Sequence, residues 1–268
     1  MHGLPWNGSP RCADGPCGGP HPTTVWQQKP SQAGTWMSRH MASAVLIGLA
    51  QSAALLLASG NVATAQQESA RAIRLPAPRR DGPLSLEAAL RVRHSTRAFA
   101  RDSLSLSDAA QLLWAAQGVN REAGGRTAPS AGATYPLEIF LLAGGVRDLP
   151  AGVYRYRPAS HDLVLTRSGD VREELVAAAL RQTWAADAAL FIVFAAVFER
   201  TAARYGPRAE RYVPMEVGHA AQNVYLQAAA LDLGTTFQGA FNDTSVTRVL
   251  GLAPDERPLG LMPVGRPR

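Results

Sequence analysis

The pattern of hydrophobic and polar positions divides residues 84–268 of this chain into helices and strands. Apolar residues recur at helical spacing in some segments and form short unbroken or alternating runs in others. The predicted helices cover residues 84–93, 105–118, 170–182, 214–234 and 244–250. The predicted strands cover residues 137–143, 153–157, 163–166, 188–197, 235–241 and 259–264.

The ends of these elements also carry signals. Ser85 is in position to cap the first helix, and either Ser105 or Ser107 the second. Pro214 is expected to begin the long fourth helix. Residues 188–197 are apolar throughout, as in a buried central strand. Since helices and strands do not alternate regularly, we predict an α+β fold in which helices flank a mixed sheet.

The start of the chain differs from the rest. Residues 1–36 are rich in Gly, Pro, Trp and Gln, and we expect a disordered or non-native head. Residues 37–65 combine a thin basic region, an apolar stretch and a small-x-small pattern ending at Ala65, which predicts a cleaved signal and an exported, periplasmic protein. A membrane anchor or a cytoplasmic protein is the alternative. Residues 66–83 are interpreted as a linker and residues 84–268 as the folded domain.

Composition limits the chemistry of the folded part. From Gln66 onward the chain has 24 arginines, no lysine and 20 acidic residues, a net charge of about +4 (24 − 20). This charge is too small to predict nucleic-acid binding. The absence of lysine excludes a Schiff base and a phosphate-loop lysine. Because Cys12 and Cys17 lie in the head, packing alone must stabilise the domain.

A basic cluster, Arg-His-Ser-Thr-Arg, occupies residues 93–97. In an extended segment Arg93, Ser95 and Arg97 point to one side. Guanidinium groups and a hydroxyl so arranged are well suited to bind a phosphate. A solvated basic turn is the alternative.

A loop of small residues, Pro-Ser-Ala-Gly-Ala-Thr-Tyr-Pro, occupies residues 129–136 just before a predicted strand. Ser130, Ala131 and Gly132 would let the backbone approach a flat ligand closely. Amides and hydroxyls of the loop would then bind the polar edge of that ligand. A plain turn is the alternative.

The long predicted helix carries Glu216, His219, Gln222 and Asn223 at helical spacing. Glu-x-x-His is half of a di-iron carboxylate motif. The sequence lacks the other half, so we expect no metal. The expected role of this polar stripe is a hydrogen-bonded contact between helices.

Residues 234–240 read Gly-Thr-Thr-Phe-Gln-Gly-Ala and offer a wall of backbone amides ending at Gly239 and Ala240. Arg266 follows later as a further phosphate contact. The chain lacks a G-x-G-x-x-G turn, a phosphate loop and a G-x-S-x-G elbow. A conventional dinucleotide-binding turn and a standard serine hydrolase are therefore excluded.

In this order the four clusters resemble the nitroreductase superfamily of flavin enzymes, and most of all its SagB-type, azoline-oxidase-like dehydrogenases. The resemblance covers about residues 84–267. The matching stretches are residues 93–99, 128–142, 212–226 with a Glu-x-Gly-His-x-x-Gln-Asn core, 234–243 and 257–267.

The resemblance implies an intertwined homodimer that binds FMN at each subunit interface. The phosphate and ribityl end would be held by Arg93, Ser95, Arg97 and Arg266. The isoalloxazine ring would be lined by Ser130, Ala131 and Gly132. Facing the cofactor or the subunit contact would be Gln222 and Asn223. The backbone amides near the N5 edge would be those of Gly239 and Ala240.

The resemblance also implies an FMN-dependent oxidoreductase. It would take hydride from a small donor, with NAD(P)H expected, and pass it to an electron-poor acceptor such as a nitroarene or quinone, or oxidise a small organic substrate. A non-catalytic flavin or nucleotide carrier is the alternative. Azoline-oxidising relatives carry a Lys-Tyr pair, thought to act in proton removal, where this chain has Arg204-Tyr205. Since arginine is not a base at neutral pH, we expect no azoline oxidation. Tyr205 is the catalytic candidate, with a packing role as the alternative.

Overall fold

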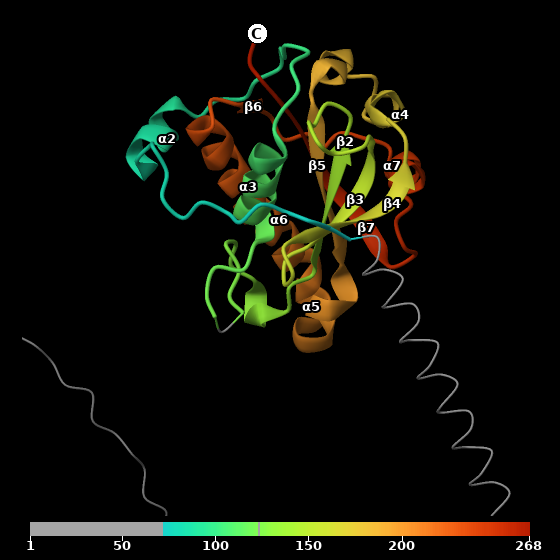
Figure 1. The fold of residues 1–268 in the computed structure, drawn as a ribbon. Coiled ribbons are helices and arrows are strands. Elements are labelled where there is room, and N and C mark those ends of the chain that lie inside the picture. The colour runs from blue at the N-terminus through green and yellow to red at the C-terminus, as the bar shows by residue number, and fades with distance from the viewer. Residues whose placement is uncertain (1–71, 123) are drawn as a thin grey trace, which may run out of the picture. The chain divides into compact units, whose positions relative to one another are not determined.

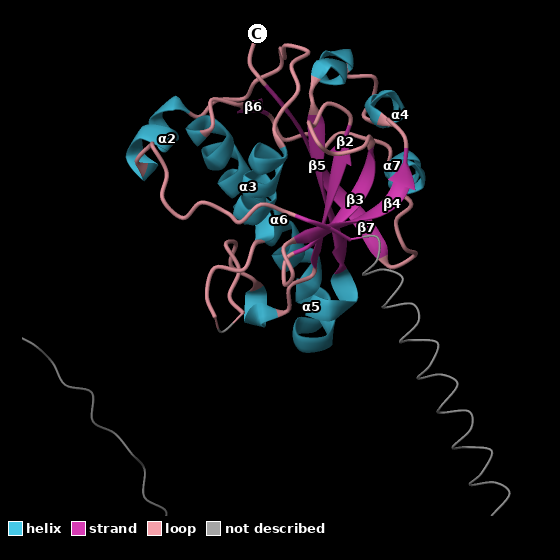
Figure 2. Ribbon diagram, viewed as in Figure 1, coloured by secondary structure: helices cyan, strands magenta, loops and turns pink. Residues whose placement is uncertain are grey.

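The computed structural model describes residues 72–122 and 124–268, which form one sheet with helices on both faces (Figure 1, Figure 2). The head and the predicted signal lie outside the described residues. Seven strands follow the order β1-β4-β3-β2-β5-β7-β6, and every neighbouring pair is antiparallel. The strands are β1 (Ala72–Arg74), β2 (Leu137–Ala143), β3 (Gly152–Arg157), β4 (Asp162–Ser168), β5 (Leu190–Val197), β6 (Gly234–Thr235) and β7 (Glu256–Gly265).

Helices cover the two faces of the sheet in separate groups. On one face α3 (Leu106–Gln117) and α6 (Ala209–Ala230) pack on each other and on β2. On the other face α4 (Arg172–Ala178) packs on α7 (Asp243–Leu250), which contacts β7. The remaining helices, α2 (Leu86–Val92) and α5 (Phe198–Tyr205), both contact α6. The predicted α+β class is therefore confirmed.

The central strand β5 is buried on both sides of the sheet. All eight of its residues are buried. Successive side chains point to opposite faces, so Ile192 and Phe194 join the core under α3 and α6, whereas Phe191 and Val193 join the core under α4 and α7. This is the buried apolar strand that the sequence predicts.

The predicted capping residues are found at two helix starts. The Ser85 hydroxyl accepts the Ala88 N–H at 3.2 Å at the start of α2. Ser105, rather than Ser107, caps α3 and forms a capping box with Asp108. Two backbone donors that would otherwise lack partners are satisfied in this box.

Two helix predictions are wrong in their bounds. The helix expected over residues 170–182 ends at Ala178, because Leu180 and Arg181 both have φ of 54°. Pro214 does not begin the long helix but lies inside α6, which starts at Ala209. A proline there costs one backbone hydrogen bond, and burial of the apolar face of α6 against the sheet outweighs that loss. The helix α5 was not predicted.

The edges of the sheet also differ from expectation. The strand predicted over residues 235–241 is reduced to β6 and one further bridge between Gln238 and Leu261. Within the predicted linker, β1 pairs with β4 and belongs to the sheet. The sheet itself was expected to be mixed, but its strands pair antiparallel, and parallel pairing among the described residues occurs only at isolated bridges, such as Ser95 with Thr235. No helix in this described part is both long and apolar enough to cross a membrane.

Candidate functional site

The basic segment after α2 is extended and lies beside β6. The Thr96 amide donates to the Thr235 carbonyl at 2.9 Å. A side chain at Gly234 would collide with Thr96, since an added Cβ would lie 2.5 Å from Thr96 Cγ2. Glycine at this position therefore allows the two segments to touch. Alternation along the extended backbone then directs Ser95 and Arg97 to the side opposite Thr96.

Tyr225 of α6 organises this end of the sheet, and the sequence analysis missed it. Its hydroxyl accepts the Phe237 amide at 2.6 Å and lies 3.3 Å from Ser95 Oγ and 3.4 Å from Thr236 Oγ1. The Arg93 guanidinium lies 5.2 Å from the ring centroid. Burial raises the pKa of Tyr225, but the hydrogen bonds to its hydroxyl outweigh burial and lower it. The feature that could have identified Tyr225 from sequence is a tyrosine, with its polar hydroxyl, on the predicted long helix just before the segment that forms β6.

The C-terminus brings Arg266 to the same place. The Ala100 amide donates to the Arg266 carbonyl at 2.9 Å, and the Arg268 amide donates to the Ala98 carbonyl at 3.1 Å. The end of the chain thus runs antiparallel to the segment that follows Arg97. Between α2, α6 and β6 lies a cavity of about 230 Å³, lined in part by Arg93.

The three arginines of this end form no ion pair within residues 72–122 and 124–268. Arg97 and Arg266 are exposed and Arg93 is half-buried. Guanidinium groups without carboxylate partners are available to bind an external anion. The fold thus brings the backbone of Arg266 beside the segment that follows Arg97, and a phosphate site shared by Arg93, Ser95, Arg97 and Arg266 stays a prediction.

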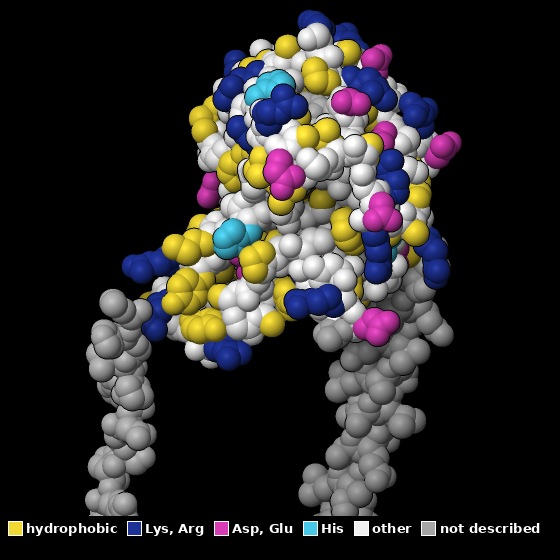
Figure 3. Space-filling model, turned by 90° about the vertical axis from the view of Figure 1, so that its left-hand side faces the viewer, with side chains coloured by type: hydrophobic (Ala, Val, Ile, Leu, Met, Phe, Trp, Pro, Cys, Tyr) yellow, Lys and Arg dark blue, Asp and Glu magenta, His cyan; other side chains and the backbone are white. Residues whose placement is uncertain are grey.

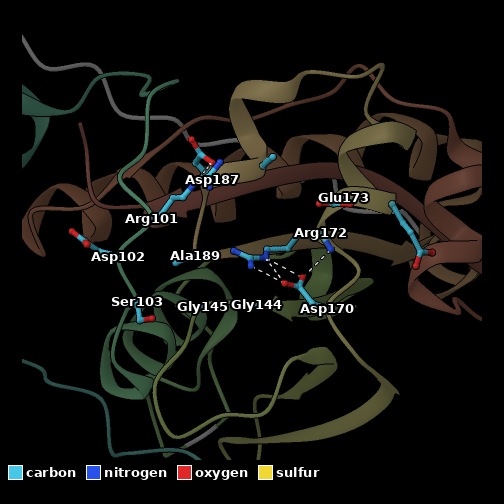
Figure 4. Close-up of a pocket in the computed structure, with 12 residues that line it drawn as sticks. Arg101, Asp102, Ser103, Gly144, Gly145, Asp170, Arg172, Glu173, Asp187 and Ala189 are labelled. Atoms are coloured by element: carbon cyan, nitrogen blue, oxygen red, sulfur yellow. Dashed lines mark hydrogen bonds and ion pairs between the residues drawn. The ribbon is translucent and has the colours of Figure 1, made fainter.

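A second cavity is lined by arginines that, unlike Arg93, Arg97 and Arg266, are paired with carboxylates (Figure 4). It has a volume of about 650 Å³ and opens beside the start of α4. Arg101 Nε lies 2.8 Å from Asp187 Oδ1, and Arg172 Nη2 lies 2.7 Å from Asp170 Oδ2. Since carboxylates already neutralise these arginines, this hollow is a poor phosphate site.

Gly239 and Ala240 are exposed and follow the bridge between Gln238 and Leu261 at the edge of the sheet. Gln182 Nε2 donates to the Ala240 carbonyl at 3.3 Å. The side chain of Gln238 is only 4% exposed, and neither of its amide atoms has a hydrogen-bond partner among the described residues. A buried unpartnered amide beside the predicted N5 wall calls for a group that the protein chain does not supply.

The small-residue loop forms a tight turn before β2. Gly132 has φ of 58°, and Ala133 and Tyr135 also have positive φ, 55° and 45°. The Tyr135 amide donates to Ser130 Oγ at 2.9 Å, which holds the turn closed. Strained backbone of this kind is concentrated at functional sites.

This loop lies at the opposite end of the sheet from the arginines. The Val197 amide donates to the Pro136 carbonyl, so the loop is beside the last residue of β5. Gly265 follows Val264, which pairs with Leu190, the first residue of β5. The length of β5 separates the two clusters by about 23 Å. One protomer therefore does not bring all the predicted site residues together.

Tyr205 and Arg204, at the end of α5, lie directly on the loop. Arg204 Nη1 donates to the Gly132 carbonyl at 3.1 Å. A Cβ added at Gly132 would lie 2.6 Å from Tyr205 Oη and 2.9 Å from Arg204 Cδ. The Tyr205 ring also packs edge-on against Tyr212, with centroids 5.3 Å apart. The tyrosine thus has both a packing contact and a place beside the loop.

The comparisons with known proteins identify the family. The model of the nitroreductase family matches residues 90–266. A protein of Methanocaldococcus jannaschii with the provisional name nitroreductase MJ1384 is 46% identical over 183 residues, 68% of this chain and 91% of that protein. The chain belongs to the nitroreductase family.

Two further proteins are similar to this nitroreductase-family protein. A crystal structure of a provisionally named nitroreductase from Ralstonia eutropha shares 34% identity, with a TM-score of 0.63 over 74% of this chain and 90% of that chain. The trifolitoxin operon protein TfxC of Rhizobium leguminosarum bv. trifolii is 28% identical over 189 residues, 65% of this chain and 53% of TfxC. The chain therefore spans about half the length of TfxC.

Glu216 on α6 is one of the buried acids of this nitroreductase-family protein. It is 3% exposed, and Gln117 Nε2 of α3 donates to its Oε1 at 3.4 Å. Burial raises the pKa of Glu216 to about 7, against hydrogen bonds from Ser130 and Gln117 and the charge of Arg126. The bond between Gln117 and Glu216 is the contact between helices that was expected for the polar stripe. Through Ser130, Glu216 also contacts the small-residue loop.

The other members of the stripe face elsewhere. His219 is exposed, so it does not share the buried environment of Glu216. Asn223 Nδ2 donates to the Thr127 carbonyl at 3.2 Å, just before the loop, and Gln222 is exposed. Within the described residues no group of three or more His, Cys, Asp and Glu is placed to hold a metal.

Proposed function

We propose that this protein is an FMN-dependent oxidoreductase that transfers reducing equivalents from a small donor, NAD(P)H, to a small electron-poor acceptor such as a nitroarene or quinone. The observation that carries the proposal is a set of three guanidinium groups, Arg93, Arg97 and Arg266, that form no ion pair within the part of the chain that the structure describes. The Ser95 hydroxyl lies on the same segment as two of them. Arginine binds phosphate oxygens through planar, charge-assisted hydrogen bonds. The phosphate of FMN fits this donor set.

Bound FMN supplies the hydride chemistry, and the protein binds, orients and shields it. The residues proposed to lie against the ring are Ser130, Ala131 and Gly132. Those proposed to present amides at its edge are Gly239 and Ala240, where the unpartnered Gln238 amide gives independent support. Gln222 and Asn223 are proposed to lie near the cofactor or the subunit contact.

The working unit that we propose is a homodimer. FMN is shorter than the distance of about 23 Å that β5 places between the phosphate cluster and the small-residue loop. A second protomer that brings its own loop to the phosphate cluster of the first removes this difficulty. The face that carries α2 has hydrophobic side chains between charged ones (Figure 3). On α2, Leu86 is 60% exposed and Leu90 is 51% exposed, which suits a surface covered by a partner.

Within the family, we propose the SagB-type branch. The support is the set of matching stretches, above all the Glu-x-Gly-His-x-x-Gln-Asn core of residues 216–223. Arg204 replaces the lysine of the azoline-oxidising pair, so the proposed chemistry is reduction of an acceptor and not azoline oxidation. Tyr205 is proposed as the residue that touches substrate at the loop.

Purification and flavin titration test the proposal. The protein should be yellow and bind FMN, and Arg97→Gln or Arg266→Gln should weaken FMN binding about tenfold each. Arg248→Gln, an exposed arginine on α7, is the matched control and should bind like wild type. Colourless protein that fails to bind added FMN would overturn the proposal. Flavin-loaded protein without turnover for any donor and acceptor pair would favour the flavin carrier.

We also propose export through the signal of residues 37–65, which lies outside the described part of the chain. N-terminal sequencing of the native protein tests it. A mature protein that begins at Gln66 in the periplasmic fraction is the expected result. An intact start at Met37 in the cytosolic fraction would contradict it.

A further inference from the structure

We infer that the acceptor used at this site carries a negatively charged group, such as a carboxylate or sulfonate, and that Arg204 binds it. The inference rests on the proposed function and specifies the substrate class of the same site. It is carried by the arrangement of Arg204 and Tyr205 on the Gly132 loop.

Arg204 is held in place by the loop but keeps most of its donors. One N–H of its guanidinium is used, in the 3.1 Å bond from Nη1 to the Gly132 carbonyl. The side chain is exposed and has no carboxylate partner in the part of the chain that the structure describes. A guanidinium has five N–H donors, so the others remain free for an anion beside the loop.

Tyr205 adds a donor on the same side of the loop. Its hydroxyl would touch a Cβ at Gly132 and makes no hydrogen bond within residues 72–122 and 124–268. Arg204 lies 5.6 Å from the Tyr205 ring centroid, a contact that helps to fix the guanidinium. The pair thus offers the charged guanidinium of Arg204 and the neutral hydroxyl of Tyr205 at one edge of the proposed binding site for the flavin ring.

The charges around α5 leave this region positive. Arg200 Nη2 is paired with Glu138 at 2.6 Å, and Glu210 is paired with Arg257 at 2.9 Å. Over residues 198–211, Arg204, Arg208, Arg211 and Glu199 form no ion pair with any described residue, which leaves a net charge of +2 (3 − 1). A positive field of this kind raises the local concentration of anionic ligands.

A matched pair of acceptors tests the inference. 4-Nitrobenzoate and 4-nitrobenzamide have nearly the same shape and differ in charge. We expect the FMN-loaded protein to bind the anion about tenfold more tightly, measured as Kd by calorimetry and by the change in flavin absorbance, with the same preference in kcat/KM. Added salt should reduce the preference.

Variants assign the preference to Arg204. Arg204→Gln should abolish it, Arg204→Lys should retain part of it, and the control Arg248→Gln should leave it unchanged. The neutral amide serves as an internal control, because a disturbed loop would weaken both ligands equally. FMN-loaded, active protein with equal affinity for both ligands would overturn the inference, as would a preference that survives Arg204→Gln. Protein that binds no FMN would instead overturn the proposed function.

Discussion

The hydroxyl oxygen of Tyr225 on α6 accepts the backbone amide of Phe237 at 2.6 Å and connects this helix to the stretch leading to Gly239. The same hydroxyl lies 3.3 Å from Ser95 Oγ. One side chain therefore sets the positions of two segments that are far apart in the sequence, the phosphate cluster and the amide wall.

Replacing Tyr225 with phenylalanine should damage both stability and cofactor binding. The half-buried Phe237 amide would lose its acceptor, which costs about 1–2 kcal/mol of the free energy of unfolding. FMN affinity should fall because Ser95 loses the hydroxyl that it contacts. Urea unfolding and flavin titration measure the two effects. Tyr212→Phe is the control, since the Tyr212 hydroxyl has no hydrogen bond among the described residues; an equal loss in both variants would contradict the prediction.

Glu216 should make stability depend on pH. Its pKa rises from 4.5 in the unfolded chain to about 7 in the fold, because of burial. The folded state therefore holds the proton more tightly than the unfolded chain. The stabilisation that protonated Glu216 gives the fold is complete below pH 4.5 and is lost as pH rises through 7. The loss amounts to about 3 kcal/mol.

The matched variant for this effect is Glu216→Gln, which keeps an acceptor for Gln117. Urea unfolding at pH 5, 6, 7 and 8 should show that the free energy of unfolding of the variant increases relative to that of wild type as pH rises. A difference between wild type and variant that stays constant over this range would show that Glu216 does not hold the proton.

In the flavin-free protein, Gln238→Leu should raise the free energy of unfolding. The leucine fills a similar volume, and removing a buried amide without partners favours the folded state by about 1 kcal/mol. Gln111 is the contrasting control, since its buried side chain bonds to Arg79 and Gln227, and Gln111→Leu should destabilise. Thermal unfolding of the two variants compares them directly. Destabilisation by Gln238→Leu of the same size as by Gln111→Leu would reveal a partner for Gln238.

Gly132→Ala should lower stability and disturb the loop, because a methyl group there meets the Tyr205 hydroxyl and the backbone has φ of 58°. Gly251 has a similar φ of 65° with no atom within 4 Å of an added Cβ. Gly251→Ala thus measures the backbone cost alone, about 1 kcal/mol. The excess loss in Gly132→Ala reports the collision, and equal unfolding free energies for the two variants would contradict it.

Much of the fold could be predicted because its signals are local. The run that became β5 is apolar throughout, and the capping serine of α3 has its partner Asp108 three residues later. The bounds of α6 could not be predicted, since a proline ordinarily marks a helix start and only packing against the sheet allows Pro214 inside. The helix α5 is short and strongly charged, and burial of Phe198 and Thr201 becomes visible only in three dimensions.

The candidate site was predictable to a similar degree. Arg93, Ser95 and Arg97 are neighbours in sequence, so their grouping could be inferred, and the match to the family linked them to Arg266. Tyr225 could not be identified, because its role depends on the register of α6 against β6. The separation of the loop from the arginines also required the strand pairing of β5 with β2 and β7.

The edge strand β1 determines how far the chain can be shortened from its N-terminal side. Its three residues are paired with Asp162, Leu163 and Val164 of β4. A shortened gene that begins before Ala72 would keep this edge covered. One that begins after Arg74 would expose the backbone donors and acceptors of β4 to other chains, which is a common cause of aggregation. Expression trials should therefore place the first residue upstream of β1.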